Sequence, residues 1–116
     1  MAIAFEQTIA DAIASLERDL GLTSAELAGG LGVTTRTLDR WRKGESLPQR
    51  EARDRLAALE QVREQAYETL IADEVRRWMR SSLPVLSGLT PSDVIRVGRA
   101  DRVHHVLGAI EHGIYI

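Results

Sequence analysis

The side chains that could bind a metal ion gather near the end of the chain. His105 and His112 are seven residues apart, which places both on one face of a helix, and Asp101 precedes His105 by four residues. A weak three-ligand site is geometrically possible, but the spacing matches neither a zincin nor a zinc finger. We expect these histidines, with His104, to lie on the exposed side of their helix without a metal.

Other groupings that support catalysis do not occur. Carboxylates such as those of Asp73 and Glu74 are adjacent and point apart on a helix, which does not suit an acid–base pair. The sequence contains no cysteine, which excludes disulfides, thiolate zinc sites and cysteine nucleophiles. It shows neither a phosphate-binding loop nor a nucleophile elbow. The sequence therefore predicts a protein that is not an enzyme and has no cofactor.

Length and composition favour a small soluble protein. The 116 residues are 44% hydrophobic and 28% charged, which suits one ordinary domain or two very small ones. No uncharged run approaches the roughly 18 residues of a membrane span, and the amino-terminal stretch contains acids and no basic leader. We expect a cytoplasmic protein that makes no membrane contact.

Charge is unevenly distributed along the chain. The formal net charge of −2 divides into −4 over residues 1–33, +3 over residues 34–55 and −1 over residues 56–116. The acidic total alone argues against nucleic-acid binding. The basic block of residues 34–55 reopens that possibility.

The elements that position these residues are predicted to be helices nearly throughout. Apolar side chains recur at spacings of three and four residues in three stretches: Ile9, Ile13, Leu16 and Leu20; Leu56, Leu59, Val62, Ala66 and Leu70; and Val103, Val106, Leu107 and Ile110. Helix starts are indicated at Thr23 with Glu26, at Thr34 or Thr35, and at Thr90 with Pro91 and Asp93. No alternating run predicts a strand, so the fold class is all-α.

The segment from Leu22 to Pro48 has the pattern of a helix-turn-helix. Leu27 and Ala28 face inward on its first helix, and Gly32 supplies the positive φ that the tight turn needs. Val33, Leu38 and Trp41 then anchor the turn and the second helix from behind. The pair Gly29-Gly30 is expected to weaken the first helix by roughly 1 kcal/mol per glycine relative to alanine.

This packing leaves one face of the second helix free to enter the major groove of DNA. Arg36 can donate two hydrogen bonds to guanine O6 and N7, and the basic residues after it are placed for phosphates. The acid Asp39 either accepts from cytosine N4 or repels phosphate. The candidate DNA-binding residues are Thr34, Thr35, Arg36, Asp39, Arg40, Arg42 and Lys43.

Residues 20–50 resemble the Xre, or lambda-repressor-like, helix-turn-helix family. The matching residues are Leu27, Ala28, Gly32, Val33, Leu38, Trp41, Gly44 and Pro48. Ser24 departs from the family, because it stands where a glutamine that touches DNA is often found.

The final third of the chain is not explained by a DNA-binding module. Trp78 and Met79 follow two arginines, and Ile114, Tyr115 and Ile116 form an apolar end. Such an end either docks back on its own domain or inserts into a partner, and the residues alone favour neither.

Residues 73–116 are similar to the toxin-binding domain of Xre-MbcA-ParS antitoxins. The resemblance rests on Trp78, Leu86 to Gly88, Pro91, Val94, Ile95, Val103, Leu107, Ile110 and Gly113. It implies a lambda-repressor-like helix-turn-helix bundle over residues 1–72 and a small helical toxin-binding domain over residues 73–116. It also implies a type II antitoxin whose partner is a RES-domain toxin that consumes NAD⁺. Family members block entry to the toxin's active site and repress their own promoter.

The resemblance directs attention to apolar anchors and arginines as contacts with such a toxin. The candidate toxin-binding residues are Trp78, Met79, Arg99, Arg102, Ile114, Tyr115 and Ile116. A homodimer is expected, because helix-turn-helix proteins usually read paired half-sites of operator DNA.

Two other readings remain open. One is a stand-alone Xre-family transcriptional repressor whose C-terminal part only dimerises. The other is an interaction protein whose helix-turn-helix has lost contact with DNA.

Overall fold

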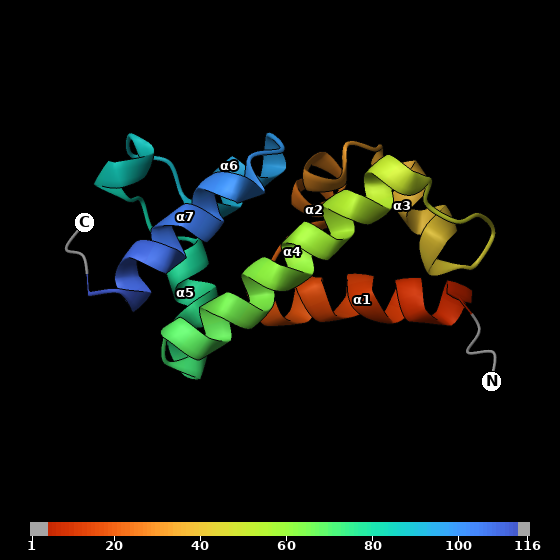
Figure 1. The fold of residues 1–116 in the computed structure, drawn as a ribbon. Helices are drawn as coiled ribbons and strands as arrows, with labels where there is room; N and C mark the ends of the chain where they lie inside the picture. The colour runs from red at the N-terminus through yellow and green to blue at the C-terminus, as the bar shows by residue number, and fades with distance from the viewer. Residues whose placement is uncertain (1–4, 114–116) are drawn as a thin grey trace.

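Helices form the whole regular structure of residues 5–113, the part of the chain that this computed structural model describes. Seven α-helices and two 3₁₀ turns occur in this range, without a strand (Figure 1), as predicted. In chain order they are α1 (Phe5–Leu20), α2 (Ser24–Leu31), α3 (Thr35–Arg42), α4 (Arg50–Thr69), η1 (Ala72–Glu74), α5 (Val75–Met79), η2 (Pro84–Leu86), α6 (Pro91–Arg96) and α7 (Ala100–Glu111). None of these helices is long and apolar enough to cross a membrane.

The predicted helix starts are confirmed by their hydrogen bonds. At α2, the hydroxyl of Thr23 accepts from the backbone N–H of Glu26, and the Glu26 carboxylate accepts from the N–H of Thr23. Thr90 and Asp93 form the same reciprocal pair at α6. Thr34, not Thr35, caps α3. Each cap gives the first N–H groups of its helix a hydrogen-bond partner.

The α2–α3 turn depends on a glycine. Gly32 has φ 73°, the left-handed conformation that a helix-ending turn needs. A Cβ at Gly32 would lie 2.4 Å from a guanidinium nitrogen of Arg55, but this is the end of a flexible, exposed side chain that can move aside. The backbone conformation is therefore what requires glycine at this turn.

One continuous hydrophobic core runs through the described chain. α4 crosses the molecule diagonally, with α1 on one side and α7 on the other (Figure 1), and it contacts both helices. The predicted apolar stripes face this core; of their members, only Leu70 and Ile110 are partly exposed. Helices on either side of the predicted boundary at residues 72/73 thus share a single core.

The closest approach between the two predicted segments is made by α2 and α6. A Cβ at Gly29 would lie 2.2 Å from the Arg96 carbonyl oxygen, and one at Gly30 would lie 3.0 Å from Cγ2 of Ile95. No side chain fits at Gly29 against the α6 backbone, and a side chain at Gly30 would require Ile95 to shift, so the glycine pair permits this contact. Gly29 and Gly30 are expected to lower the intrinsic stability of helix α2, but they allow α2 and α6 to pack tightly.

This packing can be tested with two alanine substitutions of opposite expected effect. Gly29→Ala should lower the free energy of unfolding by about 1–3 kcal/mol, because the new methyl group overlaps the α6 backbone. Gly108→Ala, in helix α7, is the matched control, because its Cβ would meet nothing closer than 3.8 Å. It should raise stability by up to about 1 kcal/mol through helix propensity. Urea denaturation measures both, and equal stabilisation by the two alanines would contradict the proposed packing.

Candidate functional site

The exposed face of α3 is built from the residues that the sequence assigned to it. Leu38 and Trp41 are buried on the inner side of the helix. The residues expected to point away from the core are all exposed: Thr34, Thr35, Arg36, Asp39 and Arg40. The orientation predicted for the second helix of the motif is therefore confirmed, and Lys43 just beyond it is exposed as well.

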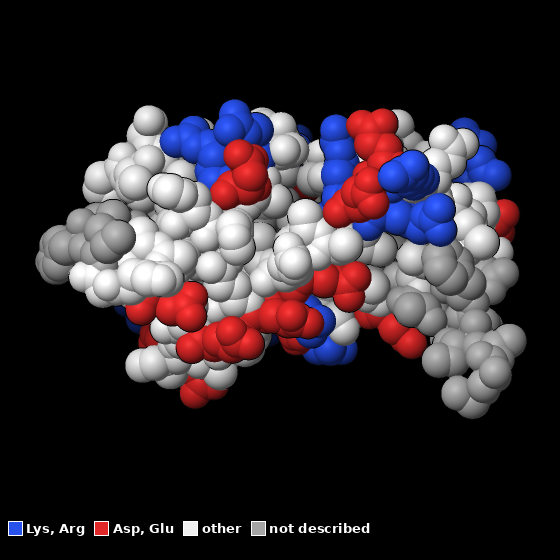
Figure 2. Space-filling view, viewed as in Figure 1, with Lys and Arg blue, Asp and Glu red and all other residues white. Residues whose placement is uncertain are grey.

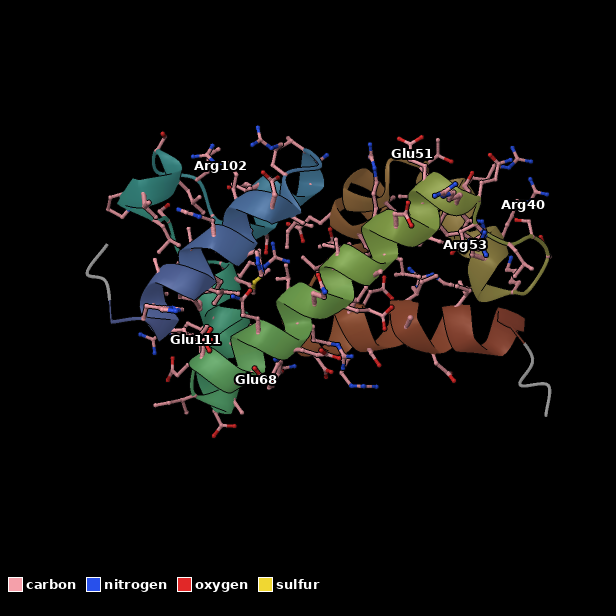
Figure 3. All side chains as sticks on the ribbon, in the orientation of Figure 1. Arg40, Glu51, Arg53, Glu68, Arg102 and Glu111 are labelled. Carbon is pink, nitrogen blue, oxygen red and sulfur yellow. The ribbon has the colours of Figure 1, made fainter. Side chains whose placement is uncertain are left out.

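Basic side chains surround this face. Figure 3 places Arg40 and Arg53 at the same end of the molecule, with Glu51 nearby. Figure 2 shows a group of Lys and Arg side chains there with some acids among them, while other Asp and Glu side chains run along the lower edge of the view. The mixed charges make this end only moderately positive.

Arg42 does not belong to the exposed basic group, and its prediction as a phosphate contact is wrong for this structure. Its guanidinium forms two hydrogen bonds of 2.5 Å to the carboxylate of Glu17 on α1 and one of 3.0 Å to the hydroxyl of Ser24. The hydrogen bonds that Arg42 donates to Glu17 raise the pKa of Arg42 further above its ordinary value. Arg42 also lies 3.5 Å from Asp39. It therefore ties the end of α3 to α1 and α2, and Ser24 serves in the same network.

The predicted toxin contacts divide between surface and core. Met79 is 0% exposed and packs in the core, so its prediction as a partner contact is wrong. Trp78 is half-buried and lines a hollow of about 390 Å³ at the corner between α4 and α5, together with Leu70 and Ile71. Ile71 is 75% exposed, which makes this corner apolar.

The two predicted arginines lie near the start of α7. Arg99 is exposed and forms a two-point ion pair with Asp101, with both N–O distances 3.0 Å. These hydrogen bonds lower the pKa of Asp101. Arg102 is half-buried and lies at the end of the molecule away from Arg40 (Figure 3). The apolar stretch of Ile114, Tyr115 and Ile116 lies outside the described residues.

The three histidines of α7 and its C-cap are exposed, as expected. Nδ1 of His104 is 2.7 Å from the side-chain oxygen of Gln65, and Nδ1 of His112 is 3.0 Å from the Gly108 carbonyl. Within residues 5–113 no three His, Asp or Glu side chains are arranged to hold a metal ion. His105, the third of these histidines, is also exposed.

An ion pair between an exposed arginine and a buried glutamate, which the sequence analysis missed, joins the two segments. Arg80, which follows α5, places its guanidinium against the Glu26 carboxylate at 2.5 and 2.7 Å. It also donates to the Gly21 carbonyl. Glu26 was recognised only as a cap, because its partner lies 54 residues further along the chain. Nearby, the buried hydroxyl of Ser92 donates to the Met79 carbonyl and joins α6 to α5.

Two opposing effects act on the pKa of Glu26. Burial raises the pKa, but hydrogen bonds from Arg80 and from the Thr23 backbone outweigh burial, so the pKa lies below its ordinary value. The charged form of Glu26 is thus favoured by folding.

Comparison with known proteins identifies the family. The model of the antitoxin Xre/MbcA/ParS C-terminal toxin-binding domain matches residues 65–113. The chain is 32% identical over 102 residues to the mycobacterial cidal antitoxin MbcA of Mycobacterium tuberculosis and of Mycobacterium bovis, covering 88% of this chain and 89% of the relative. The chain belongs to the Xre/MbcA/ParS family of antitoxins. It is therefore an antitoxin of a toxin–antitoxin system and not an enzyme.

Two further relatives agree with this assignment. A probable mycobacterial cidal antitoxin of M. tuberculosis is 26% identical over the full length of both chains. The crystal structure of the M. tuberculosis MbcT–MbcA toxin–antitoxin complex contains a chain that superposes on this antitoxin with a TM-score of 0.68 and 30% identity. That match covers 92% of the antitoxin and 96% of the other chain. The arrangement of the helices is therefore shared with MbcA.

The Glu26–Arg80 pair predicts a pH-dependent contribution to stability. Because the pKa of Glu26 is lowered by folding, its stabilisation is present above the unfolded pKa of about 4.3 and is lost as the pH falls through the folded pKa. Glu26→Gln should cost about 1–3 kcal/mol near pH 7 and progressively less below pH 4. Urea denaturation at several pH values measures the difference. Glu111→Gln, at an exposed position, is the control and should change stability little; a Glu26→Gln effect independent of pH would contradict the ion pair.

Proposed function

We propose that this antitoxin neutralises a RES-domain toxin that degrades NAD⁺, by covering the active site of the toxin with its C-terminal segment. The observation that carries the proposal is the match of residues 65–113 to a toxin-binding domain. The solved complex of the related MbcA with the toxin MbcT supports a partner of the same kind for this chain. Covering an active site requires shape and apolar contacts but no chemistry of the antitoxin's own.

Residues of the C-terminal segment are proposed as the contacts that hold the toxin. Trp78 supplies a half-buried aromatic ring beside the exposed Ile71, and Arg99 and Arg102 supply cations for carboxylates of the toxin. The apolar stretch of residues 114–116 is proposed to enter the toxin cleft.

We further propose that the antitoxin, bound to its toxin, represses its own operon by binding operator DNA as a homodimer. The exposed face of α3 and the basic side chains around it support this proposal. α3 lies at one end of a molecule that is 44 Å long, and the end of α7 lies near the other (Figure 1). DNA and toxin would therefore occupy opposite ends, and both would be bound at once.

Co-expression tests neutralisation. The protein encoded beside this antitoxin should arrest growth and deplete NAD⁺ when expressed alone, and co-expression of the antitoxin should restore both growth and NAD⁺. The neighbouring protein expressed with an empty vector serves as the negative control. A neighbour that is harmless alone, or that remains toxic beside the intact antitoxin, would refute the proposal.

Substitutions in α3 test DNA binding. Arg36→Ala should weaken binding to the operator by about 1–3 kcal/mol and relax sequence preference at one base pair. Arg40→Ala should weaken binding to all sequences and reduce the salt dependence of the affinity by about one phosphate contact. Arg42→Ala, the half-buried comparison, should instead lower the free energy of unfolding and leave that salt dependence unchanged.

Fluorescence anisotropy with promoter DNA at several salt concentrations, with and without toxin, measures these affinities. An unchanged affinity for Arg36→Ala would favour a helix-turn-helix that has lost contact with DNA. Tight binding by the antitoxin alone, together with no toxin partner, would favour the stand-alone repressor.

A further inference from the structure

An apolar surface lies between η2 and the outer side of α7. Val85, His104, His105, Gly108, Ala109 and His112 line a hollow of about 410 Å³, and we call these residues the η2–α7 surface. A second hollow of about 310 Å³ adjoins it and is lined by Val85, Leu86, Asp101, Arg102, His105 and Val106. Three of these residues, Val85, His105 and Val106, also line the first hollow, so the two hollows form one continuous surface.

The loop that carries Val85 is held in a fixed shape. The backbone N–H of Gly88 donates to the Leu83 carbonyl, and the N–H of Leu83 donates to the Leu89 carbonyl, which closes the loop on itself. Leu86 is buried and fastens the loop to the core, whereas its neighbour Val85 is 39% exposed. Ser87 adopts φ 60°, a left-handed conformation that is unfavourable for a residue with a side chain. The fold thus maintains a strained turn that displays an apolar side chain outward.

Each α-helix of the toxin-binding region packs one side against an earlier helix of the antitoxin. α6 packs on α2, α5 packs on α1, and the inner side of α7 packs on α4. The side of α7 beside η2 remains uncovered within the described residues and lies at the end of the molecule away from α3 (Figure 1). A partner docked there would not meet the proposed DNA-binding face.

The corner between α4 and α5, with Ile71 and Trp78, is the rival apolar surface. The ion pair between Glu74 and Arg77, with an N–O distance of 3.4 Å, lies on its rim, and an apolar partner would have to desolvate both charges. The larger hollow of the η2–α7 surface is lined by no Asp, Glu, Lys or Arg. An apolar side chain enters it without such a cost.

We propose that the η2–α7 surface is the face on which the toxin docks, with an apolar side chain of the toxin seated between Val85 and Ala109. This inference rests on the proposed function, because it identifies where on the toxin-binding region the toxin binds. The histidine rings at the rim offer hydrogen bonds to polar groups around that side chain. The adjoining hollow holds both Arg102 and Asp101, which offer a cation and a carboxylate to polar groups of the toxin around that contact.

Charge substitutions on the purified full-length antitoxin test the proposal. Val85→Glu and Ala109→Glu should each weaken binding to the purified toxin at least tenfold in isothermal titration calorimetry, because each puts a carboxylate into an apolar contact. Val85→Ile should keep the affinity near that of the wild type. Circular dichroism and urea denaturation should show that every variant folds.

Leu47→Glu is the matched control, because Leu47 is 43% exposed, close to Val85, but lies in the loop between α3 and α4. It should leave toxin affinity unchanged. Ile71→Glu tests the rival corner between α4 and α5. If this variant lost toxin binding while Val85→Glu and Ala109→Glu kept wild-type affinity, the proposal would be overturned.

The remaining outcomes separate this inference from the proposed function. A wild-type antitoxin that binds no toxin would refute both. A wild type that binds toxin, with a folded Val85→Glu variant that binds equally well, would overturn only the docking face. If Val85→Glu changed the oligomeric state in light scattering but not toxin binding, the surface would instead join two copies of this chain, which would also overturn the proposal.

Discussion

α6 approaches α2 so closely that two consecutive helix positions on α2 carry no side chain at all. Gly29 and Gly30 lie against the backbone of Arg96 and the side chain of Ile95, and a single methyl group at Gly29 would overlap a carbonyl oxygen. α6 is followed directly by α7, which packs along α4, so the position of α6 also bears on the position of α7. The tight contact is thus a constraint on the whole C-terminal segment, and only glycine satisfies it at Gly29.

The same segment holds α2 again at its opposite end. There, Arg80 binds the carboxylate of Glu26, which itself caps the helix, and the carbonyl of Gly21 just before it. α2 precedes α3 in the proposed helix-turn-helix, and the turn at Gly32 joins the two helices, so the position of α2 affects where α3 points. The orientation of the proposed DNA-reading helix therefore depends on residues far along the chain, in the region that matches the toxin-binding domain.

Local signals in the sequence predicted much of the fold. Apolar spacing located the long amphipathic helices, capping threonines located the starts of α2, α3 and α6, and the exposed face of α3 followed from its buried Leu38 and Trp41. Contacts between distant residues gave no such signal. Arg42 was assigned to phosphate because its partner Glu17 is 25 residues away, and Met79 was assigned to the surface because its burial depends on helices that pack from elsewhere. The exposed Val85 was missed because its neighbours on α7 are distant in sequence.

The double hold on α2 also bears on how a toxin would influence DNA binding under the proposed function. A toxin docked at the far end of α7 is connected to α3 through the continuous core and through the ion pair that holds α2. Because these contacts fix the position of α2, a small shift at the docking face would not change the orientation of α3. The basic block at residues 34–55 is modest, and the chain as a whole carries a net charge of −2. Weak single sites are strengthened when two of them are held together on one DNA duplex, since the second contact is then intramolecular. Assembly with toxin would therefore tighten operator binding by joining helix-turn-helix units and not by reshaping any one of them.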